Sequence, residues 1–328
     1  MPVVNQSMIA QQTEAAKLAS LRVVLLAGGV GGAKLAHGLA AHLRPENYTI
    51  IVNNGDDFQH WGLTICPDLD TVVYTLAGVA NPETGWGRAD ESWRVLDEVE
   101  RLGGPAWFRL GDLDLALHLS RNHALTNGVS LTEFTCELTG RLGIGPTILP
   151  MCDRPAPTLI ETDDGLLSFQ DWFVRQQWQP PVRRVQLPED VRASYQVLRA
   201  LEQADVVIFA PSNPFVSLDP ILNVYPLRAM ITDLPKLTLA VSPIIAGQAV
   251  KGPAAKMMQE MGLPVTAVAV ADYYRDLIDA FIYDVQDDTT WPDPNFPYRR
   301  LNTMMYTPTD RIHFAGELLQ FALELLDQ

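Results

Sequence analysis

The sequence predicts an α/β, Rossmann-like fold: a mostly parallel sheet with helices on both faces and a smaller inserted α+β subdomain. Two observations carry this prediction. Apolar, strand-like runs alternate with amphipathic, helix-like stretches towards both ends of the 328-residue chain, a rhythm typical of parallel sheets. The apolar run 23–27 leads directly into four glycines within residues 28–32 and then into an amphipathic stretch up to Leu43. This order indicates a buried strand, a tight turn and a helix.

The glycine-rich turn is a candidate phosphate site. Because glycine lacks a Cβ atom, backbone N–H groups can approach a phosphate closely, and the following helix adds about half a positive charge at its N-terminus. The turn fits neither standard fingerprint, because Lys34 replaces a small residue of the dinucleotide motif, and Ala33 and Leu35 break a Walker A loop. A merely tight structural turn is the alternative. The residues expected to bind phosphate are Gly29, Val30, Gly31, Gly32 and Lys34.

Acidic residues gather after the second predicted strand, Tyr48 to Val52. Asp56 and Asp57 follow this strand, and Asp68 and Asp70 lie a short distance downstream. Carboxylates beside a phosphate site repel the phosphate unless a cation lies between them, so we expect a divalent metal here, namely Mg2+. In the alternative interpretation Asp68 or Asp70 caps the next helix, and the first two acids are solvated turn residues.

The amino-acid composition and charge of the chain exclude several classes of protein. With 39 acidic and 24 basic residues, the formal charge is −15, which argues against nucleic acid or an anionic membrane as a partner. Three cysteines without a C-x-x-C pair indicate a reducing compartment without disulfides or a zinc site. No run approaches the ~20 apolar residues that span a bilayer, and residues 1–20 lack the pattern of a signal peptide. We therefore expect a cytoplasmic protein.

The middle of the chain changes character. Two short strands flank an Asp-Asp-Gly turn at 163–165, which is typical of a hairpin. Trp172, Phe173 and Trp178 follow; they belong to a core by default, although a planar substrate ring could stack on them. We expect four parts: a flexible leader at 1–20, an N-terminal Rossmann-like part with the glycine loop at 21–145, the inserted hairpin-containing subdomain at 146–188, and a C-terminal α/β part completing the sheet at 189–328.

Two helices are expected before the insert, at 91–102 and from Leu115 to Ala124. Asp112 either caps the second helix or contacts a ligand. His118 follows Asp114 by four residues on one helical face and could pair with it. The sequence Ser-Leu-Thr-Glu at 130–133 predicts a capping box for another helix.

The α/β rhythm returns after residue 189. We expect helices at 189–203, 253–261 and 308–326, and strands at 205–210, 236–241 and 264–270.

The loops after these strands should share an edge with the glycine turn, because the carboxyl ends of parallel strands meet at one edge of a sheet. Ser212 and Asn213 lie between two prolines, the second of which is Pro214. Such short polar side chains are rigidly presented, so we expect this segment to contact the ligand.

These motifs occur together in one known family. The chain resembles the 2-phospho-L-lactate transferase family, of the CofD and FbiA type, which makes the deazaflavin coenzyme F-420. The resemblance extends from about Leu21 to Asp284. It rests on eight ordered motifs: Gly28 to Lys34, Gly55 to Asp57, Cys66 to Thr71, Gly85 to Gly87, Leu110 to Asp112, Phe169 to Trp172, Ala210 to Pro214 and Ser242 to Ile245.

The resemblance implies a magnesium-dependent transfer of phospholactate, or its enolpyruvate counterpart, from a guanosine diphosphate-activated donor to the terminal hydroxyl of the deazaflavin Fo, with release of GMP. It places Asp57 and Asp68 on the metal side, and Asp70 and Arg109 on the Fo side. Ser212, Asn213 and the glycine loop would hold the guanosine diphosphate portion. A carboxylate could take the proton from the attacking hydroxyl group, and we assign this role to Asp57. Asp57 and Asp70 are the expected catalytic residues.

The chain departs from the family pattern at Leu113, where family members commonly carry a basic residue. Either Arg109 compensates, or the acceptor pocket is looser. The glycine loop and the Gly-Trp-Gly segment look more like bacterial members than archaeal ones, which hints at the enolpyruvate-derived donor. The apolar carboxyl-terminal helices make a homodimer plausible.

Two other functions would require different sequence features. A YvcK-type regulator, which binds nucleotide sugars without catalysis, would carry Gly-Gly-Ser-Ser after the paired acids, where this chain has Phe58 to Trp61. A nicotinamide-dependent oxidoreductase would need a third small residue in the glycine loop and no second acidic cluster.

Overall fold

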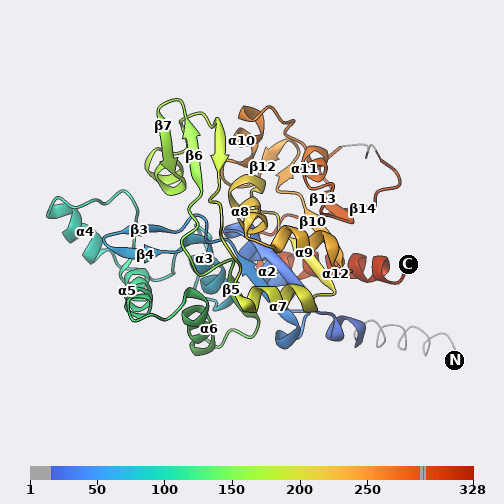
Figure 1. Cartoon of the computed structure of the whole chain (residues 1–328), viewed down its shortest axis with the longest axis horizontal. Helices are drawn as coiled ribbons and strands as arrows, with labels where there is room; N and C mark the ends of the chain where they lie inside the picture. The colour runs from blue at the N-terminus through green and yellow to red at the C-terminus, as the bar shows by residue number, and fades with distance from the viewer. Residues whose placement is uncertain (1–15, 289–290, 292) are drawn as a thin grey trace.

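The computed structural model describes residues 16–288, 291 and 293–328, so most of the predicted leader lies outside the described residues. Its centre is a seven-stranded sheet in which every pair of neighbouring strands is parallel. The strands are β1 (Val23–Ala27), β2 (Tyr48–Val52), β5 (Thr147–Pro150), β9 (Val206–Phe209), β10 (Leu237–Val241), β13 (Ala280–Asp284) and β14 (Tyr298–Leu301). Their order is β14-β13-β10-β9-β1-β2-β5, which confirms the predicted α/β, Rossmann-like fold (Figure 1).

Helices cover both faces of this sheet, as expected from strands that are apolar on both sides. Alternate residues of β1 belong to different cores: Val24 and Leu26 pack into one, and Val23, Leu25 and Ala27 into the other. On one face lie α7 (Tyr195–Gln203), α8 (Asp219–Asn223), α9 (Leu227–Asp233), α10 (Ala254–Glu260) and α11 (Ala267–Tyr273). On the other lie α2 (Val30–Ala40), α3 (Pro67–Leu76), α5 (Asp112–Thr126), α6 (Leu131–Arg141) and α12 (Pro308–Leu326).

Two small β structures lie outside the central sheet (Figure 1). The hairpin of β3 (Phe58–His60) and β4 (Leu63–Ile65) follows β2, and α4 (Arg94–Arg101) lies near it. A three-stranded sheet has the order β7-β6-β8 and is formed by β6 (Leu159–Thr162), β7 (Gly165–Ser168) and β8 (Arg184–Gln186). It lies within residues 146–188 and contains the predicted hairpin.

The remaining short elements are η1 (Pro45–Asn47), η2 (Asp171–Arg175), η3 (Pro214–Leu218), β11 (Ile244–Ile245) and β12 (Gln248–Ala249). Of the helices that the structure describes, none is both long and apolar enough to cross a membrane.

Two expectations about the second half are wrong. The strand predicted at 264–270 is replaced by α11, because the Thr266 hydroxyl caps a helix by accepting a hydrogen bond from the Ala269 amide at 3.1 Å. The strand that joins the sheet is β13, further along the chain. The helix predicted at 189–203 begins only at Tyr195, where Ser194 caps it. The capping box at Ser130 and Glu133 is confirmed.

Helix α2 packs closely against α12 at Gly38. A Cβ atom at Gly38 would lie only 2.1 Å from the carbonyl oxygen of Arg311 and 3.0 Å from the Cβ atom of Ala315. The absence of a side chain at Gly38 therefore sets the distance between the two helices. Gly140, inside α6, offers a contrast, because a Cβ atom there would meet no atom within 4 Å.

We expect Gly38→Ala to lower the free energy of unfolding by about 1–3 kcal/mol, because the added methyl group forces α12 away from α2. The matched variant Gly140→Ala should leave that free energy unchanged or raise it by up to about 1 kcal/mol, because alanine favours an open helical position. Urea titration followed by circular dichroism measures both. Equal effects of the two substitutions would contradict the inferred contact.

Candidate functional site

The candidate site lies at the carboxyl ends of β1, β2 and β9, where the glycine turn meets the loop after β9. The Gly28 amide donates a hydrogen bond to the hydroxyl oxygen of Ser212 at 3.1 Å. A Cβ atom at Gly31 would lie 2.5 Å from the carbonyl oxygen of Pro211. The structure thus brings Ser212 onto the glycine turn, as the parallel topology predicts, and the turn leads into the N-terminus of α2 at Val30.

The carboxyl group of Asp68 lies against the same turn. Cβ atoms added at Gly28 and Gly29 would come within 3.0 Å and 2.7 Å of its oxygens, so only glycine allows this approach. The Asn53 side-chain amide donates to Asp68 at 2.9 Å and to Asp56 at 3.4 Å. Neither Asp68 nor Asp70 caps α3, which starts at Pro67 without a side-chain cap. The alternative interpretation of these two acids is therefore wrong.

Asp56 and Asp68 are costly to ionise in the absence of a cation. Burial raises the pKa of Asp68 to about 6, against hydrogen bonds with Asn53 and Gly29. Burial also raises the pKa of Asp56 well above its usual range, and the charge of Asp68 adds to that shift. The Gln170 side-chain amide donates to Asp56 at 3.1 Å. Sequence reasoning included Asp56 in the acid cluster but missed the two amide donors that hold it.

Asp57 has a different set of neighbours. Burial raises its pKa well above the usual range, while the Cys66 thiol and the Arg121 guanidinium oppose the shift. Its Oδ1 atom is buried and has no hydrogen-bond partner among the described residues. Within residues 16–288, 291 and 293–328, no group of three or more His, Cys, Asp and Glu side chains is arranged to hold a metal ion by itself. A cation here would need further ligands from a substrate or from water.

Asp70 is held by a buried arginine that sequence reasoning missed. The Arg121 guanidinium forms an ion pair with Asp70 and donates to the Thr64 carbonyl oxygen at 3.1 Å. His118 lies on the same side of α5, with its Nδ1 atom 3.7 Å from Asp70, so the partner of His118 is Asp70 rather than Asp114. Burial chiefly lowers the pKa of His118 to about 4. The signal for Arg121 is its spacing of three residues from His118 on one helical face.

Asp112 has a different contact from the predicted helix cap. The carboxylate of Glu91 caps α5 by accepting hydrogen bonds from the Leu113 and Asp114 amides at 2.8 and 2.7 Å, so the predicted cap by Asp112 is wrong. Asp112 instead accepts from the Val95 amide at 3.2 Å.

Arg109 is exposed, and its guanidinium lies 4.5 Å from the centre of the Trp93 ring. The described hydrogen bonds and ion pairs include none between Arg109 and Asp70. Its predicted place on the acceptor side stays a prediction.

The residues after Ser212 have local partners. The Asn213 side-chain oxygen accepts a hydrogen bond from the Phe215 amide at 3.0 Å and so starts η3. Pro214 is buried. Ligand contact by Asn213 and Pro214 stays a prediction. Lys34 lies in the second turn of α2 and is half-buried.

An aromatic cluster lies next to the acids. It consists of Phe58, His60, Trp61, Trp107 and Phe108, with neighbouring ring centres 4.8–6.0 Å apart. The Trp61 indole donates to the Pro105 carbonyl oxygen at 2.9 Å. This hydrogen bond holds the segment that carries Trp107 and Phe108 against the β3–β4 hairpin. Phe58 directly follows Asp57, so this half-buried surface begins where the acid cluster ends.

Trp172, in contrast, is fully buried and its indole donates to the Pro180 carbonyl oxygen at 2.9 Å. Its default assignment to a core is confirmed.

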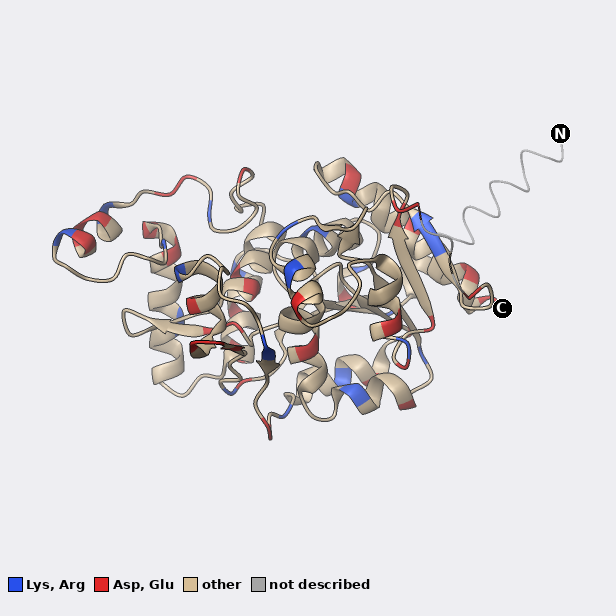
Figure 2. Cartoon of the chain, turned by 90° about the horizontal axis from the view of Figure 1, so that it is seen from above, with Lys and Arg blue, Asp and Glu red and all other residues tan. Residues whose placement is uncertain are grey.

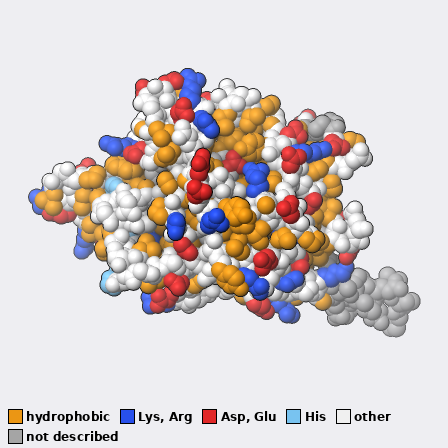
Figure 3. All heavy atoms as spheres, in the orientation of Figure 1, with side chains coloured by type: hydrophobic (Ala, Val, Ile, Leu, Met, Phe, Trp, Pro, Cys, Tyr) orange, Lys and Arg blue, Asp and Glu red, His pale blue; other side chains and the backbone are white. Residues whose placement is uncertain are grey.

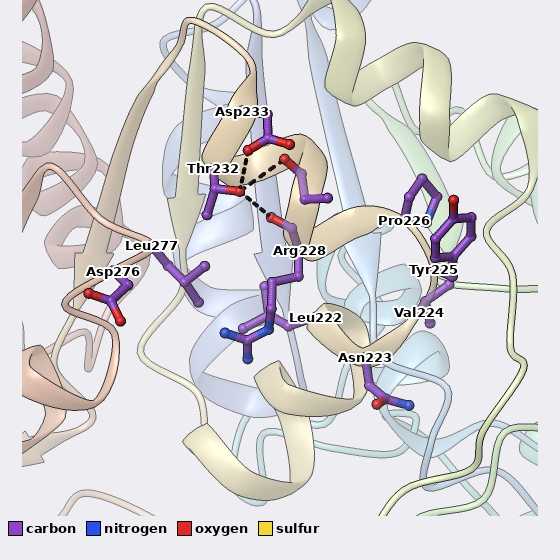
Figure 4. Close-up of a pocket in the computed structure, with 11 residues that line it drawn as sticks. Leu222, Asn223, Val224, Tyr225, Pro226, Arg228, Thr232, Asp233, Asp276 and Leu277 are labelled. Atoms are coloured by element: carbon purple, nitrogen blue, oxygen red, sulfur yellow. Dashed lines mark hydrogen bonds between the residues drawn. The ribbon is translucent and has the colours of Figure 1, made fainter.

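A separate surface pocket of about 590 Å³ is lined by residues of α8, α9 and the segment 276–277 (Figure 4). Hydrophobic side chains also gather on this face near α8 and α9 (Figure 3). None of the predicted site residues lines this pocket. The chemistry that the acids and the glycine turn can support therefore lies elsewhere, at the strand ends.

Comparison with known proteins shows which family the chain matches. The family model described as 2-phospho-L-lactate transferase CofD matches residues 23–296. A phosphoenolpyruvate transferase of Thermobifida fusca is 39% identical over 324 residues, which cover 94% of this chain and 100% of that protein. A phosphoenolpyruvate transferase of Kitasatospora aureofaciens is 41% identical, with 82% and 86% covered. A 2-phospho-L-lactate transferase of Methanosarcina acetivorans is 36% identical, with 93% and 99% covered.

The similarity of this chain to solved structures concerns the fold alone. A crystal structure of a UPF0052 family protein from Bacillus halodurans superposes with a TM-score of 0.54 and 16% sequence identity, covering 82% of each chain.

Asp114 gives a pH-dependent prediction. Burial raises its pKa to about 7, and the charges of Asp70 and Glu91 add to the shift. Below about pH 4, Asp114 carries its proton in both the folded and the unfolded chain. Between about pH 4 and 7 only the folded chain keeps this proton. The Asp114 carboxyl group therefore makes folding less favourable as the pH rises. Relative to wild type, Asp114→Asn should gain on the order of 2–4 kcal/mol in unfolding free energy between pH 4 and 8. Parallel pH profiles of the two proteins in urea titrations would contradict the raised pKa.

Proposed function

Because this chain belongs to the CofD family of 2-phospho-L-lactate transferases, we propose that it transfers a phospholactate or phosphoenolpyruvate group from a guanosine diphosphate-activated donor to the terminal hydroxyl of the deazaflavin Fo, and releases GMP. The family supports the transferase class. The single observation that best supports the proposed chemistry is the carboxyl group of Asp68 held against the backbone of Gly28 and Gly29. This contact joins an amide-rich phosphate site to a group of acids.

The donor diphosphate would lie on the glycine turn, where the amides at the N-terminus of α2 face an anion. Asp57 and Asp68 would hold Mg2+, which prefers carboxylate oxygens and takes its other ligands from phosphate and water. The unpartnered Oδ1 atom of Asp57 fits this role. When bound, the metal would neutralise charge on the transferred group. A cation would also remove the cost of ionising the buried acids beside it.

The reaction joins the Fo hydroxyl oxygen to the phosphorus atom that carries the three-carbon acid and breaks the bond from that phosphorus to the GMP oxygen. We assign Asp57 to accept the hydroxyl proton, because among these acids it is the one that directly precedes the aromatic cluster in the chain. The Oδ2 atom of Asp70 has no hydrogen-bond partner among the described residues, while Arg121 holds the other oxygen. Asp70 can therefore accept a hydrogen bond from the acceptor.

The relatives favour the enolpyruvate donor. The two bacterial relatives described above, both named phosphoenolpyruvate transferases, are 39% and 41% identical to this chain. The archaeal relative named 2-phospho-L-lactate transferase is 36% identical.

The aromatic cluster would bind the flat ring of Fo. Aromatic faces stack on planar heterocycles, and this cluster begins one residue after the proposed base. Trp107 contacts Phe58, His60 and Phe108, so its ring is part of the same surface.

We expect Trp107→Leu to raise the KM for Fo by roughly five- to tenfold, because one stacking partner is lost, and to leave the KM for the donor unchanged. The matched control is Trp178→Leu, at an exposed position in the insert, which should change neither constant. Steady-state kinetics with each substrate varied in turn measures both values. An equal rise of both KM values in the Trp107 variant would contradict a role in acceptor binding.

Mass spectrometry of the product tests the reaction. Wild-type protein with Mg2+, Fo and the enolpyruvate-bearing donor should release GMP and add the mass of the phosphoenolpyruvate group to Fo. Asp57→Asn should lower this turnover by at least about a hundredfold, because it removes both the base and a metal ligand, while the fold stays intact. Asp276→Asn, an exposed acid far along the chain, is the matched control and should retain full activity.

Retained activity of Asp57→Asn at saturating Mg2+ would remove Asp57 from the mechanism. The competing donor with lactate belongs in the same experiment, since its product differs in mass. A thermal-shift series separates the rival functions: GDP with Mg2+ should raise the melting temperature. The transferase proposal fails if GDP and Fo leave it unchanged while a UDP-sugar raises it.

A further inference from the structure

Four basic side chains on or beside α2 form no ion pair among the described residues. Lys34 and His37 belong to α2, Arg311 belongs to α12, and Lys251 lies in the loop after β12; together they are called the basic cluster. Basic residues elsewhere are scattered among acidic ones (Figure 2), and the chain carries a formal charge of −15. Even so, the ion pairs among the described residues include none of these four.

The packing of α12 on α2 brings three members together. Gly38 lies beneath the backbone of Arg311, and Lys34 lies one helical turn before Gly38 on the same face of α2. His37 adjoins Gly38 in the chain. The three side chains therefore belong to the region where α12 packs on α2.

Lys251 lies beside the first residue of α2, one helical turn before Lys34. Its Nζ atom donates to the Thr84 carbonyl oxygen at 2.7 Å. A Cβ atom at Gly85 would lie 3.4 Å from this Nζ atom and 3.0 Å from the Cγ1 atom of Val30, the first residue of α2. The ammonium group of Lys251 thus lies close to the helix N-terminus that forms the phosphate site.

The members of the cluster repel one another. The pKa of Lys34 is lowered by burial and then by the charges of Arg311 and Lys251, and the pKa of His37 by burial and then by Arg311. Asp310 is the acid nearest to them, but its carboxylate accepts the hydrogen bond of the Thr307 amide at 2.7 Å. The Nε atom of Arg311 and the Nδ1 atom of His37 are buried without a hydrogen-bond partner among the described residues.

Grouped positive charges with unused donors lower the free energy of an anion bound between them. We propose that the basic cluster binds a second oxyanion, a phosphate or carboxylate, of the same ligand whose first phosphate lies on the glycine turn. This inference rests on the proposed function for the identity of that ligand, a guanosine diphosphate derivative. The chemistry of the site itself, an oxyanion site next to a helix N-terminus, does not depend on it.

Isothermal titration calorimetry with GDP, GMP and inorganic pyrophosphate, each with Mg2+, tests the inference. Lys251→Met should weaken the binding of GDP and of pyrophosphate by about tenfold, the loss of one charged contact, and leave that of GMP unchanged. Lys251→Arg should restore binding. The matched control is Lys236→Met, a half-buried lysine at the start of β10 that bonds the Leu201 carbonyl oxygen; it should bind all three ligands as the wild type does.

The outcomes separate the two proposals. The inferred site would be overturned if the wild type and Lys251→Met bound pyrophosphate and GDP with equal affinity. It would also be overturned if the substitution weakened the binding of GDP and of GMP by the same factor. If pyrophosphate binds in a Lys251-dependent way but neither guanine nucleotide binds, the oxyanion site stands and the proposed donor fails. If pyrophosphate alone binds in that way while GDP and GMP bind to both proteins with equal affinity, the site serves a free anion and the link to one ligand is wrong.

Discussion

The approach of the Asp68 carboxyl group to the backbone of Gly28 and Gly29 is the contact on which the site depends. A Cβ atom at either glycine would lie within 3.0 Å of a carboxyl oxygen, so a side chain there would force α3 away from the turn. The parallel register of β1 and β2 ends both strands at the same level, which brings the two segments within reach. Amide donors and carboxylate acceptors then share one small volume, and this combination suits a phosphate paired with a cation.

The charge balance of the site is set by a small number of buried polar groups. The charges of Asp57 and Asp68 raise the pKa of Asp56, and the charge of Asp68 also raises that of Asp57. The Asn53 amide donates hydrogen bonds to both Asp56 and Asp68. Arg121, buried in α5, is a permanent cation in this region and pairs with Asp70. Because an unpaired buried charge is costly, this pair fixes α5 relative to α3. The neutral state of His118 leaves Arg121 as the charged partner of Asp70.

Sequence patterns could predict β1, β2, β9 and β10 because these strands are apolar runs, such as Val23 to Ala27 and Val206 to Phe209, bounded by glycine, proline or polar residues. They did not predict β5, β13 or β14, and β14 carries two arginines between Tyr298 and Leu301. They failed at 264–270, where an apolar run short enough for a strand forms a helix because Thr266 caps it. Within the site, the positions of Asp68 and Ser212 followed from the topology of parallel sheets. The contacts of Arg121 and Glu91 did not, because each joins residues 20 or more positions apart, and no local pattern encodes such a pairing.

Acids and bases lie near the same glycine turn but on different elements: the acids follow β2 and begin α3, whereas the basic cluster belongs to α2, α12 and the loop after β12. A ligand with two anionic groups can contact both sides, one group through a cation on the acids and the other directly on the bases. On the proposed reaction this ligand is the donor. After transfer, GMP keeps one phosphate, and the second anionic group leaves with the acceptor. Each product then retains only part of the contacts that held the donor, so the same charges that bind the substrate tightly favour release of the products.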